Sequence, residues 1–215
     1  MHSSFDQLGD VAGAAGFRDV DGVLFDLGLS SFQLDDPERG FAFRAEGPLD
    51  MRLDRTAGRP AADLVNRLPE RDLAALIREF GEERWAQRIA QFVVARRPLR
   101  TTSDLAAAVE AAIPRGAWPK RIHPATRTFQ ALRIEVNDEL GSLERALPQA
   151  AALLKPGGRL AVICFHSLED RAAKRFIRAD PALKPVTKRP LSPSAAEAGR
   201  NPRARSARLR VAEKL

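Results

Sequence analysis

Continuous apolar runs and helical patterns alternate at two places in the chain. The first run lies in DGVLFDLG and predicts a buried strand over residues 22–27, preceded by a short helix in VAGAAGF. The second run, RLAVICF, follows a helical pattern over residues 126–154 and precedes a predicted helix in SLEDRAAKRFIR. Strands with continuous apolar runs are covered by helices on both faces and are typical of parallel sheets. The pattern therefore predicts an α/β fold.

Turn and cap signals set the expected ends of these elements. The helical pattern over residues 126–154 ends at KPGG, and we expect breaks in it near Gly141 and Pro148. Ser167 is the expected N-cap of the next helix. Near the C-terminus, ARLRVAE alternates between apolar and polar residues, which predicts an edge strand in a hairpin that closes one side of the sheet.

The residues between these two units show helical patterns and no strand signal. Three amphipathic helices are expected in LPERDLAALIREFG, EERWAQRIAQFVVARRP and TTSDLAAAVEAAIP, with stop signals at Gly81, Pro98 and Pro114. Five arginines cluster on or after the second of these helices: Arg84, Arg88, Arg96, Arg97 and Arg100. As a group they favour a basic surface, although each alone fits an ordinary solvated helix face.

The composition is basic because of arginine. Lys and Arg number 35 against 28 Asp and Glu, the formal net charge is +7, and only six of the 35 are Lys. Arginine binds phosphate through two parallel hydrogen bonds and stacks on bases, so a nucleic-acid partner fits this composition. The codon usage of a GC-rich genome explains it equally well.

Cysteine, histidine and hydropathy patterns exclude other classes of protein. The single cysteine, Cys164, excludes an intrachain disulfide framework, and its place in the apolar run LAVICF predicts a buried packing role. Three histidines and one cysteine predict no metal site. No signal-peptide pattern and no apolar run long enough to span a bilayer occur in the sequence. We therefore expect a cytoplasmic protein with no membrane partner.

Asp26 ends the first predicted strand, where the chain enters a polar loop. A carboxylate in this position is either a helix or turn cap or part of a binding site, because open α/β sheets bind ligands beyond the carboxyl ends of their strands. The sequence pattern alone leaves both interpretations open.

Five stretches in series resemble one family of enzymes. They are DGVLFDLGLSSFQLDDPERGFAF, GPLDMRLD, HPATRTFQALRIEVNDEL, CFHSLEDR and NPRARSARLRVAEKL. Together they are similar to the ribosomal RNA small subunit methyltransferase H family, whose members methylate the N4 amine of a decoding-centre cytosine in 16S rRNA with S-adenosylmethionine. The resemblance covers nearly the whole chain, and its motifs occur in the family's order.

The resemblance implies a domain organisation and partners. Residues 1–34 and 125–215 would form a partial Rossmann-like sheet of the class I methyltransferase type, and residues 35–124 an inserted all-helical domain that recognises the substrate. The implied cofactor is S-adenosylmethionine, and the implied partner is 16S rRNA or the small ribosomal subunit. The oligomeric state stays open, with a dimer as one option.

The resemblance also assigns residues to the methyl-transfer site. Phe5, Asp26 and Gln33 match positions that contact S-adenosylmethionine, Phe5 beside the adenine and the other two nearer the methionine end. Without the resemblance, Phe5 reads as an ordinary hydrophobic anchor. For the group that accepts a hydrogen bond from the cytosine amine, Asp26 is the first candidate and His166 the second. A purely structural role explains His166 equally well.

Four further residues are candidates for binding the RNA backbone or the flipped base: Arg52, Arg127, Gln130 and Arg133. Arg127 and Arg133 are six residues apart on a predicted helix and do not share a face, whereas Gln130 lies three from each. We therefore expect at most one of these arginines to point into the site and the other to pair with a carboxylate such as Glu135 or Asp138.

The chain departs from the family because it has neither the glycine-rich turn that cradles S-adenosylmethionine nor the acidic residue that holds the ribose. No glycine-rich GxG turn occurs before Asp26, and Gly13 and Gly16 stand in a different context. We expect the Asp26 strand to be an open edge, and we expect the 215 residues alone neither to bind S-adenosylmethionine tightly nor to turn over. A start codon assigned too late, a fragment of a longer protein and a truncated remnant all explain this departure.

Two other classes of protein compete with the methyltransferase interpretation. A non-catalytic RNA-binding module would keep the basic helical insert and bind RNA in a salt-sensitive way without the cofactor. A nucleotide-dependent oxidoreductase has only fold analogy in its favour, and the missing glycine fingerprint weakens it further.

Overall fold

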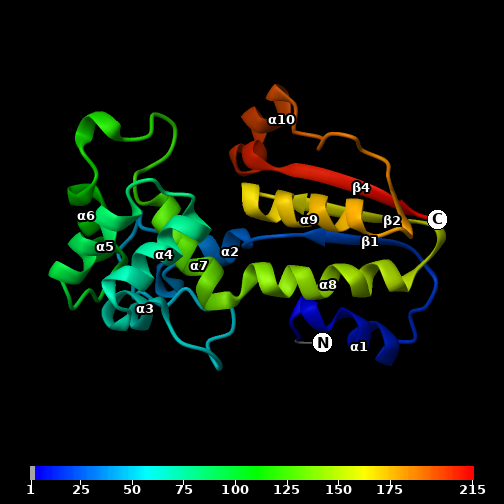
Figure 1. The fold of residues 1–215 in the computed structure, drawn as a ribbon, viewed down its shortest axis with the longest axis horizontal. Helices are drawn as coiled ribbons and strands as arrows, with labels where there is room; N and C mark the ends of the chain where they lie inside the picture. Colours follow the sequence, from blue (N-terminus) through cyan, green and yellow to red (C-terminus); the bar gives the residue numbers. More distant parts are fainter. Residues whose placement is uncertain (1–2) are drawn as a thin grey trace. The chain divides into compact units, whose positions relative to one another are not determined.

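The computed structural model describes residues 3–215 and divides them into two compact units (Figure 1). One unit comprises the residues up to Gly28 together with Leu140–Leu215, and the other comprises Leu29–Glu139. The first contains the sheet and the second is helical. Each unit has its own hydrophobic core.

The sheet of the first unit has four strands among the described residues. They are β1 (Val20–Asp26), β2 (Leu154–Cys164), β3 (Leu183–Pro185) and β4 (Arg208–Lys214), in the spatial order β1-β2-β4-β3. β1 runs parallel to β2, and β4 is antiparallel to both of its neighbours. The predicted α/β fold with a parallel strand pair is therefore confirmed.

β4 is an interior strand, so the prediction of an edge strand for ARLRVAE is wrong. Its alternation has another cause, which is that Arg210 and Ala212 are buried while their neighbours in β4 are only partly covered. The expected hairpin partner exists as the short β3, although a long connection with α10 (Ala195–Arg200) and η4 (Pro202–Ser206) separates the two strands. The open edge expected for the Asp26 strand is confirmed for the described residues, since β1 ends the strand order and Leu24 is 64% exposed.

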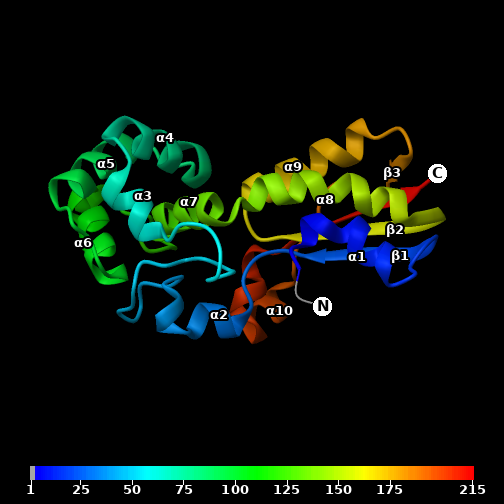
Figure 2. The ribbon, with the colours of Figure 1, turned by 90° about the horizontal axis from the view of Figure 1, so that it is seen from below.

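Helices α8 (Glu139–Leu153) and α9 (Ser167–Ala179) lie on one face of this sheet (Figure 2). Leu143, Leu147 and Ala150 of α8 share a core with Phe25 of β1 and Val162 of β2. Ahead of the sheet in sequence, η1 (Phe5–Gln7) and α1 (Leu8–Ala14) lie against α8. They are held there by Gln149, whose amide accepts from Gly9 N at 2.7 Å and donates to the Asp6 carbonyl at 2.7 Å.

The long helical pattern over residues 126–154 breaks at a different place from the one predicted. It forms α7 (Thr126–Asn137) and α8, which are separated at Asp138, a residue with φ of 46°. A short polar side chain tolerates this left-handed conformation, which closes α7. The breaks predicted near Gly141 and Pro148 are wrong, because Pro148 lies inside α8 and the packing of Leu147 and Ala150 against the sheet maintains the helix.

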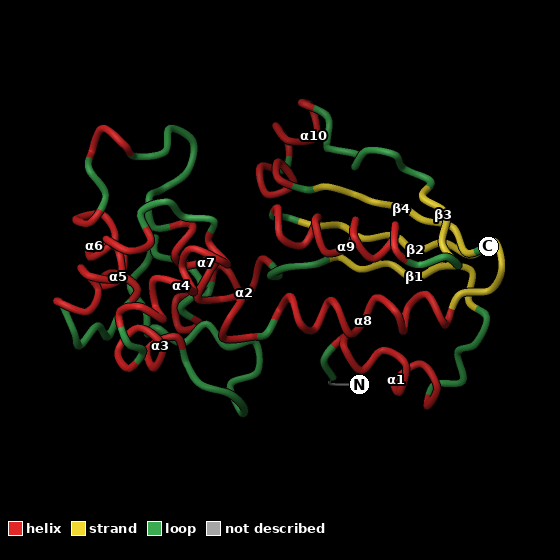
Figure 3. The backbone as a smooth tube through the Cα atoms, viewed as in Figure 1, coloured by secondary structure: helices red, strands yellow, loops and turns green. Residues whose placement is uncertain are grey.

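The second unit is helical, and the only strand-like pairing among its described residues is one isolated bridge between Pro48 and Thr101 (Figure 3). Its elements are α2 (Ser31–Asp35), η2 (Pro37–Arg39), α3 (Ala61–Arg67), α4 (Glu70–Gly81), α5 (Ala86–Ala95), α6 (Thr102–Ala112), η3 (Arg115–Ala117) and α7. The three amphipathic helices predicted for this region are confirmed as α4, α5 and α6. The seven-residue α3 was not predicted. None of the helices found among residues 3–215 is long and apolar enough to cross a membrane.

Gly81 is the point of closest approach between α4 and α7. A Cβ atom there would lie 2.7 Å from the carbonyl oxygen of Arg127 and 3.5 Å from the Ala131 side chain. The absence of a side chain at this position therefore sets the separation of the two helices, whose facing residues Ile77 and Leu132 are fully buried.

We expect Gly81→Ala to lower the free energy of unfolding by about 1–3 kcal/mol, because overpacking at a backbone contact forces the helices apart. Urea denaturation of the purified chain measures this change. Gly13→Ala is the matched control, since Gly13 lies within α1 and a Cβ there meets nothing within 4 Å. The control should leave stability unchanged or raise it by up to about 1 kcal/mol. Equal stability of the two variants would contradict the close approach.

Candidate functional site

The parallel pairing of β1 with β2 places Asp26 at the carboxyl edge of the sheet. Asp26 is the last residue of β1 and pairs with Ile163, and Leu27 N continues the ladder by donating to the Ile163 carbonyl at 3.1 Å. Gly28 follows with φ of 97°, a conformation that L side chains rarely adopt, and turns the chain. Asp26 therefore sits where β1 ends, directly before this turn.

The Asp26 carboxylate is exposed and has no hydrogen-bond or ion-pair partner among residues 3–215. A capping carboxylate would accept a hydrogen bond from a nearby backbone N–H group. The structure therefore excludes the cap interpretation and leaves a negatively charged group that is available to a ligand at the end of a parallel strand.

Phe5 reaches the same end of β1. Its ring packs edge-on against the ring of Phe25, with the centroids 6.0 Å apart and the planes at 65°. Phe25 is buried and directly precedes Asp26, whereas Phe5 remains 39% exposed. The sequence thus brings two of the predicted cofactor residues, Phe5 and Asp26, to one end of one strand.

Gln33, the third predicted cofactor residue, belongs to the helical unit. It closes the first turn of α2 in a capping box, in which Gln33 Oε1 accepts from Ser30 N at 3.0 Å and Gln33 N donates to Ser30 Oγ at 3.3 Å. Its carbonyl oxygen is thus used locally. Among the described residues, no group bonds to its side-chain NH₂, which leaves a donor at the surface of α2.

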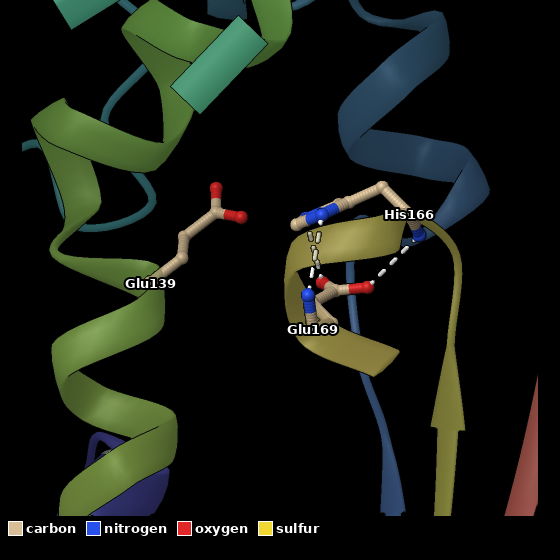
Figure 4. A group of neighbouring side chains, drawn as sticks. All are labelled: Glu139, His166 and Glu169. Atoms are coloured by element: carbon tan, nitrogen blue, oxygen red, sulfur yellow. Dashed lines mark hydrogen bonds and ion pairs between the residues drawn. The ribbon is translucent and has the colours of Figure 1, made fainter. Parts of the chain in front are cut away.

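His166 is the N-cap of α9, in place of the predicted Ser167. Glu169 N donates to His166 Nδ1 at 3.5 Å, and the Glu169 carboxylate accepts from His166 N at 3.2 Å (Figure 4). The same carboxylate also accepts from Phe165 N at 2.7 Å. Because this capping box uses the histidine ring, the helix begins one residue earlier than a serine cap implies.

The other ring nitrogen of His166 is not used by the cap. Nε2 is buried and lies 3.1 Å from Glu169 Oε1, but the direction of approach does not make a hydrogen bond. His166 is thus fixed in orientation by Nδ1, and Nε2 has no hydrogen-bond partner among residues 3–215.

The predicted RNA-binding residues make contacts within the helical unit. Arg52 forms a two-pronged ion pair with the buried Asp50, at 2.7 and 3.0 Å, and this hydrogen bonding holds the pKa of the Asp50 carboxyl below its ordinary value. Arg133 forms a similar pair with Glu139, at 2.7 and 2.8 Å. The partner of Arg133 is therefore Glu139 rather than the predicted Glu135 or Asp138.

Arg127 and Gln130 connect α7 to the end of α4. Arg127 Nη1 donates to the Glu82 carbonyl at 3.3 Å, and Gln130 Nε2 donates to the Phe80 carbonyl at 3.0 Å. Arg127 also lies 3.7 Å from the buried Glu83 carboxylate and stays 43% exposed. These two side chains position α7 and α4 relative to each other.

An ion pair that the sequence analysis missed connects α9 to β4. Arg210 donates to both carboxylate oxygens of Asp170, at 2.6 and 3.0 Å, with about a tenth of each side chain exposed, and Arg208 approaches the same carboxylate at 3.5 Å. Burial alone would raise the pKa of Asp170, but the hydrogen bonds and charges of the arginines outweigh it and the pKa is lowered. Arginines two residues apart in a strand share a face, which is the signal that would have indicated this pair.

Cys164, at the end of β2, is buried, which confirms the packing role predicted for it. Burial raises the pKa of its thiol to about 12. The thiolate is thus absent near neutral pH, and Cys164 is not a candidate nucleophile.

The sequence matches the model of the MraW methylase family over residues 1–215. It is similar to several proteins named ribosomal RNA small subunit methyltransferase H. That of Geobacter sulfurreducens is 52% identical over 233 residues, which cover 99% of this chain and 75% of the relative. That of Deinococcus radiodurans is 54% identical over 217 residues (100% and 69%), and that of Symbiobacterium thermophilum is 50% identical over 236 residues (100% and 74%).

We expect Asp170→Asn to lower the free energy of unfolding by about 3 kcal/mol, because Arg210 then stays buried without a counter-charge. The pair contributes its stability fully above pH 3.8, the ordinary carboxyl value, and loses it as the pH falls through the lower folded pKa. Denaturant titrations at several pH values should therefore show a shallower acid-induced loss below pH 3.8 in the variant.

Asp21→Asn is the matched control, because Asp21 pairs with Lys155 but is 90% exposed. It should unfold like the parent chain. If the two variants had the same stability, the pair between α9 and β4 would not contribute as described.

Proposed function

We propose that this chain, which belongs to the MraW methylase family, transfers a methyl group from S-adenosylmethionine to the N4 amine of a cytosine in 16S rRNA. The observation that carries the proposal is the exposed, unpartnered Asp26 carboxylate at the carboxyl end of a parallel strand. The sequence of the chain is 52% and 54% identical to two proteins named ribosomal RNA small subunit methyltransferase H.

The residues around β1 fit a positively charged methyl donor. A carboxylate with no protein partner balances a sulfonium charge, and ligands of open α/β sheets bind where Asp26 stands. Phe5 is 39% exposed beside Phe25 and thus offers aromatic surface for the flat adenine. Gln33, which belongs to the helical unit, is assigned to the methionine end by the family resemblance alone, and its side-chain NH₂ is the group that would bind there. Bound S-adenosylmethionine would supply an electrophilic methyl group.

The acceptor amine needs help from a base because its lone pair is delocalised into the cytosine ring. Asp26 accepts a hydrogen bond from the N4 amine, directs its lone pair, and receives the proton that the nitrogen loses after transfer. His166 is the weaker candidate for this role, because its Nδ1 already caps α9 and holds the ring in place. It retains Nε2 as a group that can face the substrate.

We further propose that the inserted residues 35–124 recognise the RNA, with α5 as the contact surface. Arg88 and Arg96 stack on the ring of Phe92 at 5.4 and 4.8 Å, and Arg84 stacks on Trp85 at 5.6 Å. Residues 88, 92 and 96 are four apart, so they share one helix face. Arg96 also donates one N–H to the Phe92 carbonyl at 3.4 Å, and the guanidinium groups over these rings have further N–H donors for phosphate or a base.

Arg97, another arginine of the predicted basic cluster, has a structural role instead of an RNA-binding one. Arg97 donates to the carbonyls of Val65 and Leu68, at 2.7 and 2.6 Å, and thereby joins α5 to α3. We assign RNA contact to Arg84, Arg88 and Arg96 rather than to Arg97. The partner is the small ribosomal subunit or its rRNA, and the place of action is the cytoplasm.

Replacing Asp26 tests the methyl-transfer role. In cells lacking the gene for this chain, the wild-type gene should restore N4-methylation of the 16S rRNA cytosine, and Asp26→Asn should lower its rate at least about 100-fold. Mass spectrometry of digested rRNA measures the modification. Asp21→Asn, at the opposite end of β1, is the control and should complement fully.

The outcomes separate two candidate functions. If deletion of the gene leaves the modification unchanged while the purified chain binds rRNA in a salt-sensitive way, the chain is a non-catalytic RNA-binding protein and the methyl-transfer proposal fails. Full complementation by Asp26→Asn would remove Asp26 from the mechanism.

The α5 surface is tested by Arg88→Gln/Arg96→Gln. We expect weaker binding of an rRNA transcript and a salt dependence of log K shallower by about 1.4, since each lost phosphate contact on single-stranded RNA removes about 0.7. Filter binding over a series of salt concentrations measures the slope. The control is Arg71→Gln/Arg78→Gln on α4, whose exposed arginines stack on no aromatic ring among residues 3–215. An equal effect of both pairs would show only the loss of net charge.

A further inference from the structure

The first unit contains a cleft that the methyl-transfer site does not use. It has a volume of about 260 Å³ and lies between α9, the segment that follows β3, and β4. The cleft lies toward the edge of the sheet that is away from β1, because β2 and β4 come between β1 and β3 in the strand order. Adjacent strands are about 4.8 Å apart, so β4 lies roughly 10 Å from β1 across the sheet.

The cleft is basic. Four of its lining residues are cations, Lys174, Arg178, Lys188 and Arg210, and no lining residue is acidic. Asp170, behind the cleft, is shared between Arg210 and Arg208, so one carboxylate serves two arginines. The local charge therefore remains strongly positive.

Three of these cations are available to a ligand. Lys174, Arg178 and Lys188 form no ion pair among the described residues, whereas Arg210 is buried and fixed by its two bonds to Asp170. Four like charges around one small cleft repel one another, and an anion between them relieves that repulsion.

The walls of the cleft strengthen its attraction for an anion. Ile177 is buried, and Val211 and Pro185 add apolar surface, so the effective dielectric constant is lower than in open water. Val211 N donates to Thr187 Oγ1 at 3.0 Å, and Val186 N donates to the Val211 carbonyl at 2.9 Å. These bonds hold the segment against β4 and fix the backbone that carries Lys188.

We propose that this cleft binds a phosphate group of the RNA backbone and anchors the substrate away from the nucleotide that is methylated. The inference rests on the proposed function for its choice of RNA as the source of the phosphate. The volume is below the roughly 300–1,000 Å³ of small-molecule pockets, which favours one anionic group of a polymer over a whole nucleotide. Because the cleft lies about two strand spacings from β1, the phosphate that it binds belongs to a part of the RNA near the methylated nucleotide.

The test is RNA binding by the chain Lys174→Gln/Arg178→Gln/Lys188→Gln, measured by fluorescence anisotropy with a labelled small-subunit rRNA transcript and no S-adenosylmethionine. We expect weaker binding and a salt dependence of log K shallower by about 2, since three contacts to single-stranded RNA each contribute about 0.7. The charge-conserving variant Lys174→Arg/Arg178→Lys/Lys188→Arg should bind like the parent chain.

A matched control removes three exposed cations that form no ion pair among the described residues and lie outside the cleft: Arg18→Gln, Arg44→Gln and Lys120→Gln. It should keep most of the parent salt slope. Circular dichroism of all variants should show the parent helix content and melting temperature. A titration with inorganic phosphate, with chloride at equal ionic strength as the reference, distinguishes a site for free phosphate from an anchor for RNA. Inorganic phosphate would saturate a site for free phosphate, but it would not saturate an RNA anchor.

Each outcome decides the proposal. A cleft variant that binds RNA like the parent chain or like the matched control, a parent chain that binds no RNA, or full displacement of RNA from the cleft by inorganic phosphate would overturn it. If the cleft variant loses RNA binding and the complementation experiment finds no methylation, the anchor stands and the methyl-transfer proposal falls. If methylation is found and the cleft variant binds normally, only the anchor falls.

Discussion

The parallel register between β1 and β2 is the constraint on which the first unit depends. It brings the carboxyl ends of two strands to one edge of the sheet, and Asp26 and Cys164 mark those ends. The two residues differ because of their surroundings: Cys164 points into the core, whereas the Asp26 carboxylate stays in water with no protein partner among residues 3–215. An unpaired, exposed carboxylate adds little stability to the fold, and it is the group on which the proposed methyl-transfer role rests.

Arginine has two distinct roles in this protein. Arg97, Arg133 and Arg210 bind carbonyls or carboxylates at partly buried positions and join elements of the fold. Arg88 and Arg96 are exposed and lie instead over the ring of Phe92, and Arg96 Nη1 also donates to the Phe92 carbonyl at 3.4 Å. Composition alone cannot separate these roles, because the planar guanidinium group binds both carboxylates and phosphates through two parallel hydrogen bonds.

The sequence predicted the strands and the amphipathic helices well because their signals are local. The apolar run of β2 and the helical periods of α4, α5 and α6 depend on residues within one turn or one pleat. It failed where distant residues decide. Pro148 stays helical because the sheet packs against α8. The misplaced cap of α9 is a local error instead, because His166 forms the capping box with Glu169, three residues later. The interior position of β4 depends on β3, a strand of three residues too short to leave a signal of its own.

α9 connects three features of the first unit. Its first turn is closed by His166 and Glu169 at the carboxyl edge of the sheet, Asp170 joins it to β4, and Lys174 and Arg178 of its second half line the basic cleft. Thirteen residues of helix span about 20 Å as one rigid body. An anion bound in the proposed cleft would hold the second half of this helix. The same rigid helix carries the His166 and Glu169 cap at its other end, so the two ends cannot shift independently of each other.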